Sequence, residues 1–221
     1  MAIHLIRHGE TASNRQRVLQ IPETPLSQNG LAQAALMAKR LARAGITRIL
    51  ASDYARAYMT ATRLAEATGV PVESEPLLRE RNFGALRGVP YAELSENPFG
   101  PGFSPPEGED WATFHARVDR AWARVAQVAL ETEGELAVVT HGLVLHSIVL
   151  RHVDVRSGEP AEGASVSEVI AGAGIDGPPL RFGNTAVTTV AREAPWRVSL
   201  FGCTAHLDAD TADDPESISG L

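Results

Sequence analysis

The sequence predicts an α/β domain with a mostly parallel β-sheet, and two observations lead to this fold class. Segments with the patterns of β-strands alternate along the chain with segments that repeat apolar residues at the helical period. Residues 135–140 (ELAVVT) carry few polar side chains, which is typical of a strand buried on both faces of a parallel sheet. Neither an internal repeat nor a linker divides the chain. We therefore expect a single domain over residues 1–206, followed by a tail.

The first half of the chain is predicted to form strand–helix units and then a short edge strand. Residues 27–45 place apolar side chains at helical spacing and end at Gly45, which we expect to cap a helix. Pro71 favours an edge position for the short strand around it, because proline has no N–H to donate to a neighbouring strand. The elements predicted here are strands over residues 2–6, 47–52 and 70–74 and helices over residues 27–45 and 55–69.

A loop rich in proline and glycine separates these elements from a second set. Residues 97–108 contain four prolines and three glycines, so we expect neither a helix nor a strand there. Residues 154–183 are also rich in glycine and proline and show no period. The elements predicted in this half are helices over residues 110–134 and 142–153 and strands over residues 135–140, 185–192 and 196–202, of which the last two can form a hairpin.

The negative charge of the chain is concentrated at its end. The formal net charge is −7, and residues 207–221 hold five acidic residues and no basic one, which leaves 22 acidic against 20 basic residues in the rest. We expect this segment to be a solvated, disordered tail. Because the body is nearly neutral, it has no strongly basic surface, and neither nucleic acid nor an anionic membrane is an expected partner.

The sequence carries no signal for export or membrane insertion. No apolar run reaches the roughly 18 residues that a membrane span needs, and the first ten residues (MAIHLIRHGE) lack the basic start of a signal peptide. Cys203 is the only cysteine, so the chain forms no internal disulfide, which fits a reducing compartment. We therefore expect a cytoplasmic protein. The sequence leaves open whether it forms a homodimer.

Polar residues follow several predicted strands directly. Arg7 and His8 follow the first strand, Arg56 lies in the first turn of the helix after the second, and His141 follows the strand over residues 135–140. The carboxyl ends of parallel strands meet at one edge of a sheet, where ligands bind in α/β folds. Gly9 lets the backbone approach a ligand closely. This pattern predicts a site for an anionic ligand.

Five segments in order resemble the histidine phosphatase superfamily, which includes the cofactor-dependent phosphoglycerate mutases. Together they are far more specific than any one alone, and they cover most of residues 1–153, with a weaker match at GNTAVTTV (183–190). The segments are LIRHGETASN (5–14), LQIPETPLSQNGLAQA (19–34), SDYARAYMTA (52–61), LRERNFG (78–84) and VVTHG (138–142). The resemblance implies a three-layer sandwich, with helices on both faces of the sheet, as in phosphoglycerate mutases.

The resemblance also implies phosphoryl transfer through a phosphohistidine. His8 would be the nucleophile, because a neutral imidazole beside two arginines has its pKa lowered. Arg7 and Arg56 would hold the phosphoryl oxygens with planar forks. His141 would add a donor, as would Asn14 and Gln20. Glu80 would protonate the leaving oxygen and then activate water.

The function that we predict is hydrolysis of a small phosphorylated metabolite, without a metal or another cofactor. The seven histidines show no spacing typical of a zinc or dimetal site. The alternatives are a phosphoglycerate mutase and a non-catalytic phosphate-binding relative, which need not keep Glu80. Mutases carry a long basic insertion before the second HG, whereas this chain has only a short loop and one helix there. On that helix we expect Arg117, Arg120 and Arg124 to form a solvent-facing row.

Three positions depart from the family pattern. Many members have tryptophan where Ser13 stands, glycine where Ile21 stands, and an acid or amide where Arg87 stands. The first two changes alter the wall of the pocket and leave the charged residues in place. For Arg87 we favour a surface role over contact with a second anionic group of the substrate.

Overall fold

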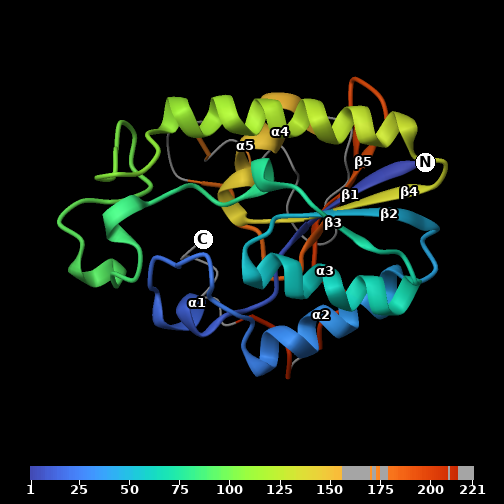
Figure 1. Ribbon diagram of the computed structural model, residues 1–221, viewed down its shortest axis with the longest axis horizontal. Helices are drawn as coiled ribbons and strands as arrows, with labels where there is room; N and C mark the ends of the chain where they lie inside the picture. The colour runs from blue at the N-terminus through green and yellow to red at the C-terminus, as the bar shows by residue number, and fades with distance from the viewer. Residues whose placement is uncertain (156–169, 171–172, 175–178, 209, 214–221) are drawn as a thin grey trace.

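A six-stranded sheet forms the centre of the molecule (Figure 1). The structure is a computed structural model that describes residues 1–155, 170, 173–174, 179–208 and 210–213. The strands lie in the order β3-β2-β4-β1-β5-β6. Their bounds are β1 Ala2–Arg7, β2 Ile46–Ala51, β3 Val72–Ser74, β4 Glu135–Thr140, β5 Val187–Ala191 and β6 Val198–Cys203.

The first four strands of that order are parallel, as the sequence predicts. β1 and β2 both pair with β4 in parallel, and β3 pairs with β2 in parallel at the edge. β5 runs antiparallel to β1, and β6 pairs with β5 in the predicted hairpin. Because the central strands are parallel, their carboxyl ends meet at a single edge of the sheet.

Helices cover both faces of the sheet, so the three-layer sandwich is confirmed. In Figure 1, α2 (Gln28–Leu41) and α3 (Ala55–Thr68) lie below the sheet, and α4 (Trp111–Glu131) and α5 (Gly142–His152) lie above it. Side chains of β4 alternate between two apolar cores: Val138 packs with α4 and α5, and Val139 packs with α2 and α3. Among the described residues, no helix is both long enough and apolar enough to cross a membrane.

The predicted helix over residues 27–45 is too long at its end. It begins as expected, since the Ser27 side chain accepts a hydrogen bond from the Gly30 N–H, but it ends at Leu41. Gly45 has a φ of 77° and its carbonyl oxygen accepts a hydrogen bond from the Glu135 N–H, so it directs the chain into β2 and does not cap the helix. By contrast, Gly69 caps α3 with a φ of 75°, as predicted.

Short helices that the sequence did not predict lie beyond the carboxyl edge of the sheet. They form where hydrogen bonds close single turns, which leave no repeating apolar pattern. The loop over residues 97–108 contains no helix or strand, as predicted. The short helices are α1 (Ala12–Gln16) and the 3₁₀ helices η1 (Pro76–Leu78), η2 (Gly84–Leu86) and η3 (Tyr91–Glu93).

Part of the acidic C-terminal segment packs against the domain. Gln33 Nε2 donates to Asp213 Oδ1 over 2.7 Å, and the Asn184 N–H donates to Asp213 Oδ2 over 2.6 Å. These contacts lie beyond the predicted end of the domain at residue 206, so Asp213 is not the solvated residue that we expected. The count of acidic residues in this segment could not predict these contacts, because the partners of Asp213 are distant in sequence. Residues 214–221, and most of residues 156–178, lie outside the described residues.

Candidate active site

The predicted site residues come together at the carboxyl edge of the sheet. Arg7 is the last residue of β1 and pairs in register with Thr140, the last residue of β4. The next residues along the two strands are therefore neighbours: His8 and His141 have ring centroids 5.2 Å apart. Arg56, from the first turn of α3, lies with its Nε 3.3 Å from His8 Nε2.

The His8 ring has a defined protonation state. Its Nδ1 lies 2.7 Å from the Gly9 carbonyl oxygen, which can only accept a hydrogen bond, so Nδ1 carries the proton and Nε2 the lone pair. Burial, Arg56 and Arg7 hold the pKa of His8 well below its usual value of 6.5. At neutral pH, His8 is thus a neutral imidazole whose Nε2 carries the lone pair that a nucleophile requires and accepts a hydrogen bond from Arg56 Nε.

Several buried donors around His8 lack a hydrogen-bond partner among the described residues. They are Arg7 Nε and Nη2 and Asn14 Nδ2, and His141 Nδ1 joins them in the tautomer in which Ser52 donates to His141 Nε2. The other polar atoms of these side chains are engaged: the Phe182 carbonyl accepts from Arg7 Nη1, Asn14 Oδ1 accepts from the Thr11 N–H over 3.1 Å, and Ser52 Oγ lies 2.8 Å from His141 Nε2. Unpaired buried donors are rare in folded proteins. This arrangement suits a ligand that presents several anionic oxygens.

Glu80 approaches the same place from the loop after η1. Its Oε1 accepts from the Arg81 N–H over 2.9 Å, and its Oε2 accepts from the Leu143 N–H over 3.2 Å. Burial raises the pKa of Glu80, more than these N–H groups and the nearby Arg56 lower it. Glu80 is therefore a carboxyl group that can hold and release a proton.

A pocket contains four of the predicted residues, His8, Gln20, Arg56 and Glu80. Gln20 Oε1 accepts from Thr11 Oγ over 3.0 Å, which links it to the turn that carries Asn14. The remaining lining is largely apolar and aromatic: Leu19, Tyr54, Arg81, Phe83, Arg87, Tyr91, Phe99 and Leu143.

Arg87 lies on the wall of this pocket, in place of the surface role that we favoured. It is partly buried, and its Nη2 donates to the Tyr54 hydroxyl over 2.8 Å. Its position was missed because the single turn of η2 directs it inward, and one turn gives no periodic signal.

Three supporting residues were also missed. They are Ser52, Asn184 and Thr60. Ser52 Oγ lies 2.8 Å from His141 Nε2, Asn184 Nδ2 donates to the His8 carbonyl over 3.0 Å, and Thr60 Oγ accepts from the Gly9 N–H over 3.0 Å. Ser52 follows β2 directly, so the strand-end argument that selected His141 could have selected it too. Asn184 belongs to the weakly matching segment GNTAVTTV.

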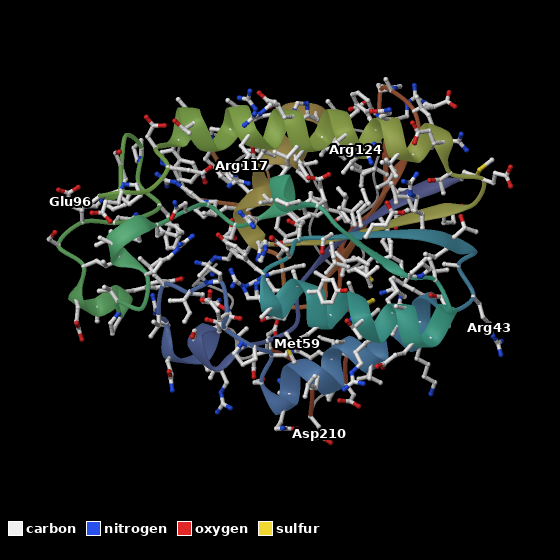
Figure 2. The ribbon with its side chains drawn as sticks, viewed as in Figure 1. Arg43, Met59, Glu96, Arg117, Arg124 and Asp210 are labelled. Carbon is white, nitrogen blue, oxygen red and sulfur yellow. The ribbon has the colours of Figure 1, made fainter. Side chains whose placement is uncertain are left out.

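The predicted solvent-facing row on α4 is wrong for Arg117 (Figure 2). Its side chain is only 14% exposed and pairs with Glu109, whereas Arg120 is exposed and the Arg124 side chain is 38% exposed. The helical period correctly places these residues near one another, but it carries no information about the loop that covers Arg117.

A family model for the histidine phosphatase superfamily (branch 1) matches residues 3–169. The chain belongs to this superfamily. It is similar to the probable phosphoglycerate mutase GpmB of Yersinia pestis, at 30% identity over 97% of this chain and 98% of that protein. A family resemblance and an assembled site agree that this member of the histidine phosphatases is an enzyme.

Solved structures of other proteins share the fold. One is YhfR of Bacillus stearothermophilus, with a TM-score of 0.72 and 23% identity over 94% of this chain and 99% of that one. Another is a mycobacterial glucosyl-3-phosphoglycerate phosphatase in complex with VO3, with a TM-score of 0.67 and 24% identity over 86% of this chain and 90% of that one. At this level of identity, the likeness establishes the three-layer fold of the histidine phosphatases.

Proposed function

We propose that this histidine phosphatase hydrolyses a small phosphorylated metabolite through a phosphohistidine on His8. The observation that carries the proposal is the set of buried, unpartnered polar atoms of Arg7, Asn14 and His141, which lie at the ends of β1 and β4 and in the turn that follows His8. A phosphoryl group has the charge and the acceptor oxygens to pair with all of them. Arg7 and Arg56 neutralise the charge that spreads over these oxygens in the transition state.

The reaction would proceed in two steps. His8 Nε2 attacks phosphorus, a bond from nitrogen to phosphorus forms, and the ester bond from phosphorus to oxygen breaks. Glu80 gives its proton to the departing alkoxide, so the product leaves as an alcohol. Water then attacks the phosphohistidine and Glu80 takes up a proton from it, which releases inorganic phosphate and restores neutral His8.

The nucleophile is tested by trapping the intermediate. Rapid quenching with a labelled phosphoester should leave acid-labile, base-stable phosphate on the protein. His8→Ala should abolish both the label and turnover. His152→Ala is the control, since His152 lies at the far end of α5 from His141 and pairs with Asp119. Label that persists in the His8 variant would assign the nucleophile to another residue.

We also infer that hydrolysis needs no metal ion. The positive charge that phosphoryl transfer requires comes from Arg7 and Arg56. Among the described residues, no cluster of three His, Cys, Asp or Glu side chains could hold a metal. Activity should survive prolonged EDTA treatment and gain little from magnesium. A large loss that magnesium restores would contradict this part of the proposal.

A mutase is the second candidate, because the Yersinia relative is named as a probable phosphoglycerate mutase. A mutase must hold a doubly anionic substrate and keep water from the phosphohistidine. In the described part of the chain, the pocket wall beyond the phosphate donors carries aromatic side chains beside two arginines that already have partners: Arg81 donates to backbone carbonyls, and Arg87 Nη2 donates to the Tyr54 hydroxyl. This lining favours hydrolysis.

The two candidates differ in their products. With 3-phosphoglycerate and catalytic 2,3-bisphosphoglycerate, a phosphatase should release inorganic phosphate or leave both compounds unchanged. A mutase should exchange the 2- and 3-phosphate isomers faster than it releases phosphate. If isomer exchange is the faster process, the mutase replaces the phosphatase as the function.

A further inference from the structure

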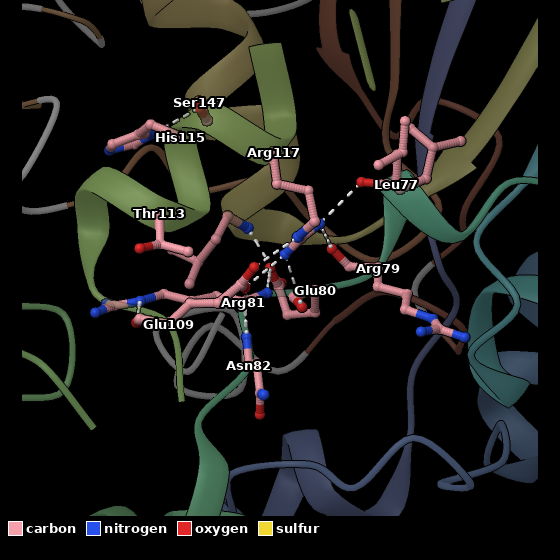
Figure 3. Close-up of polar contacts among 12 residues, drawn as sticks. Leu77, Arg79, Glu80, Arg81, Asn82, Glu109, Thr113, His115, Arg117 and Ser147 are labelled. Carbon is pink, nitrogen blue, oxygen red and sulfur yellow. Dashed lines mark hydrogen bonds and ion pairs between the residues drawn. The ribbon is translucent and has the colours of Figure 1, made fainter. Parts of the chain in front are cut away.

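The backbone that carries Glu80 is held by a side chain from another element. Arg117, on α4, reaches into the loop over residues 77–82 (Figure 3). Its Nη1 donates to the carbonyl oxygens of Leu77 over 2.8 Å and Arg79 over 2.7 Å. Its Nη2 donates to the Glu80 carbonyl over 3.3 Å. One guanidinium thus binds three carbonyls in this short stretch.

Glu109 binds both Arg117 and the same loop. Its carboxylate accepts from Arg117 Nε and Nη2, both over 2.7 Å, so every N–H direction of the guanidinium has a partner. Glu109 Oε2 also accepts from the Asn82 N–H over 2.9 Å. The Glu109 N–H donates to the Asn82 carbonyl over 2.8 Å, and the Glu109 carbonyl accepts from Arg81 Nε over 2.9 Å.

These hydrogen bonds hold the backbone around Glu80 in the absence of regular secondary structure. Glu80 lies between η1, which ends at Leu78, and η2, which begins at Gly84, and it belongs to no helix or strand. The side chains of Arg117 and Glu109 are each only 14% exposed, and burying an ion pair brings little net stability. Stability alone is therefore a weak reason for placing this pair here, next to a carboxyl group that must be aimed accurately.

We propose that Arg117 and Glu109 are positioning residues that fix the direction of the Glu80 carboxyl toward the leaving oxygen. The proposal rests on the proposed function, in which Glu80 is the general acid. It also explains why Arg117 faces inward on a helix whose neighbouring arginines face solvent. Arg117 touches neither the substrate pocket's phosphate donors nor His8; it acts through the loop.

The test uses the leaving group as a readout. Arg117→Met and Glu109→Gln should each lower kcat about 10- to 100-fold for an alkyl phosphate, whose alkoxide needs the proton. For p-nitrophenyl phosphate, whose leaving group needs no proton, the burst rate of p-nitrophenol release should change less than about threefold, because this rate reports attack by His8 before Glu80 activates water, and His8 and the phosphate donors are untouched. A purely structural role would lower both rates together. Equal losses on the two substrates would overturn the proposal.

A double-mutant cycle tests whether Arg117 acts through Glu80. In a Glu80→Gln background, Arg117→Met should reduce alkyl phosphate turnover less than about threefold further, because the proton donor is already gone. Full additivity would overturn the proposal. Arg117→Lys keeps the charge but has three donors where five are used, so it should recover little of the lost rate. Complete recovery by lysine would replace positioning with simple electrostatics.

The control is another forked ion pair of α4. Arg151 donates to both carboxylate oxygens of Asp119, over 2.9 and 2.6 Å, away from the pocket. Asp119→Asn should leave the ratio of alkyl to aryl rates unchanged, and thermal unfolding of every variant should identify those that fail to fold. If the unmodified protein shows no phosphoenzyme, the proposed function fails. If it does and the ratio does not move, only the positioning role fails.

Discussion

In the proposed mechanism, arginines of the site hold charge, His8 is the nucleophile and Glu80 transfers protons. Arg56 keeps its charge at neutral pH, although burial lowers its pKa to about 10. His8 and His141 are kept neutral, because burial, then Arg56, lower both pKa values well below 6.5. Burial shifts the pKa of Glu80 upward. The same buried environment thus favours the neutral imidazole and the protonated carboxyl that the proposed mechanism uses.

These shifts predict how activity depends on pH. His8 must be neutral, so its low pKa keeps the enzyme active below pH 6.5. Glu80 must be protonated for alkyl substrates, so their kcat should fall as the pH rises through its raised pKa. The burst rate of p-nitrophenol release, which precedes water activation by Glu80, should lack this fall. Glu80→Gln should remove the fall in kcat with rising pH for alkyl phosphates, and it should lower their kcat about 10²- to 10⁴-fold near the pH optimum. Profiles of the two substrates that stay parallel in both proteins would contradict the prediction.

The residues that the sequence could locate are those that follow strands. Arg7, His8 and His141 lie where parallel strands end, and sheet geometry alone brings such positions together. Arg117 and Asp213 could not be located in this way. Each contacts the site region through loops, and the partners of a loop depend on tertiary packing that no local pattern encodes.

At the level of elements, α2 is docked closely against the turn that follows β1. A Cβ built on Gly30 would lie 2.0 Å from the Glu10 carbonyl oxygen, and one on Gly9 would lie 2.6 Å from the Gly30 carbonyl oxygen. The contact is reinforced by polar groups, since Ser27 Oγ donates to Glu10 Oε1 over 2.6 Å and the Glu10 N–H donates to Gln33 Oε1 over 2.9 Å. The helix therefore supports the backbone next to His8.

Gly30→Ala should separate α2 from this turn. The added methyl group meets backbone that cannot rotate away, and overpacking of this kind costs about 1–3 kcal/mol of unfolding free energy. We expect a lower Tm and weaker binding of inorganic phosphate, measured by calorimetry. Gln28→Ala, an exposed change in the same first turn, should alter stability by less than about 0.5 kcal/mol. Unchanged stability of the Gly30 variant would show that the helix can move without disturbing the turn.

Elements with a strong period were predicted, and their ends were predicted less well. β4 has the predicted bounds, whereas α2 ends before Gly45. A period identifies the body of a helix, but its end depends on which hydrogen-bond partners the next residues find. α1 has too few residues to show a period, although it carries Asn14.

For the molecule as a whole, a residue near the C-terminus, Asp213, reaches the groups that hold the turn after β1. Asp213 accepts from Asn184 and Gln33, Asn184 donates to the His8 carbonyl, and Gln33 accepts from the Glu10 N–H. The C-terminal segment thus contacts both groups that hold the turn after β1. Losing one buried acceptor leaves its donors unpaired, at about 1–3 kcal/mol each.

Truncation should reveal this connection. A chain that ends at Leu207 loses Asp213, so we expect a lower Tm and a kcat/KM reduced several-fold for p-nitrophenyl phosphate. A chain that ends at Asp213 is the control, because it keeps both hydrogen bonds of that carboxylate. Equal activity of the two truncated chains would mean that the contacts of Asp213 do not support the site.

The strand order also determines when during synthesis the site can assemble. β1 is translated first, but its neighbours in the sheet are β4 and β5, which end at Thr140 and Ala191. A nascent chain therefore has to wait for most of its length before Arg7 and His8 gain the strands on either side. Until then both edges of this apolar strand are unpaired and open to wrong partners. Assembly of the candidate site is consequently a long-range event, and contacts between distant segments of a chain form more slowly than local ones.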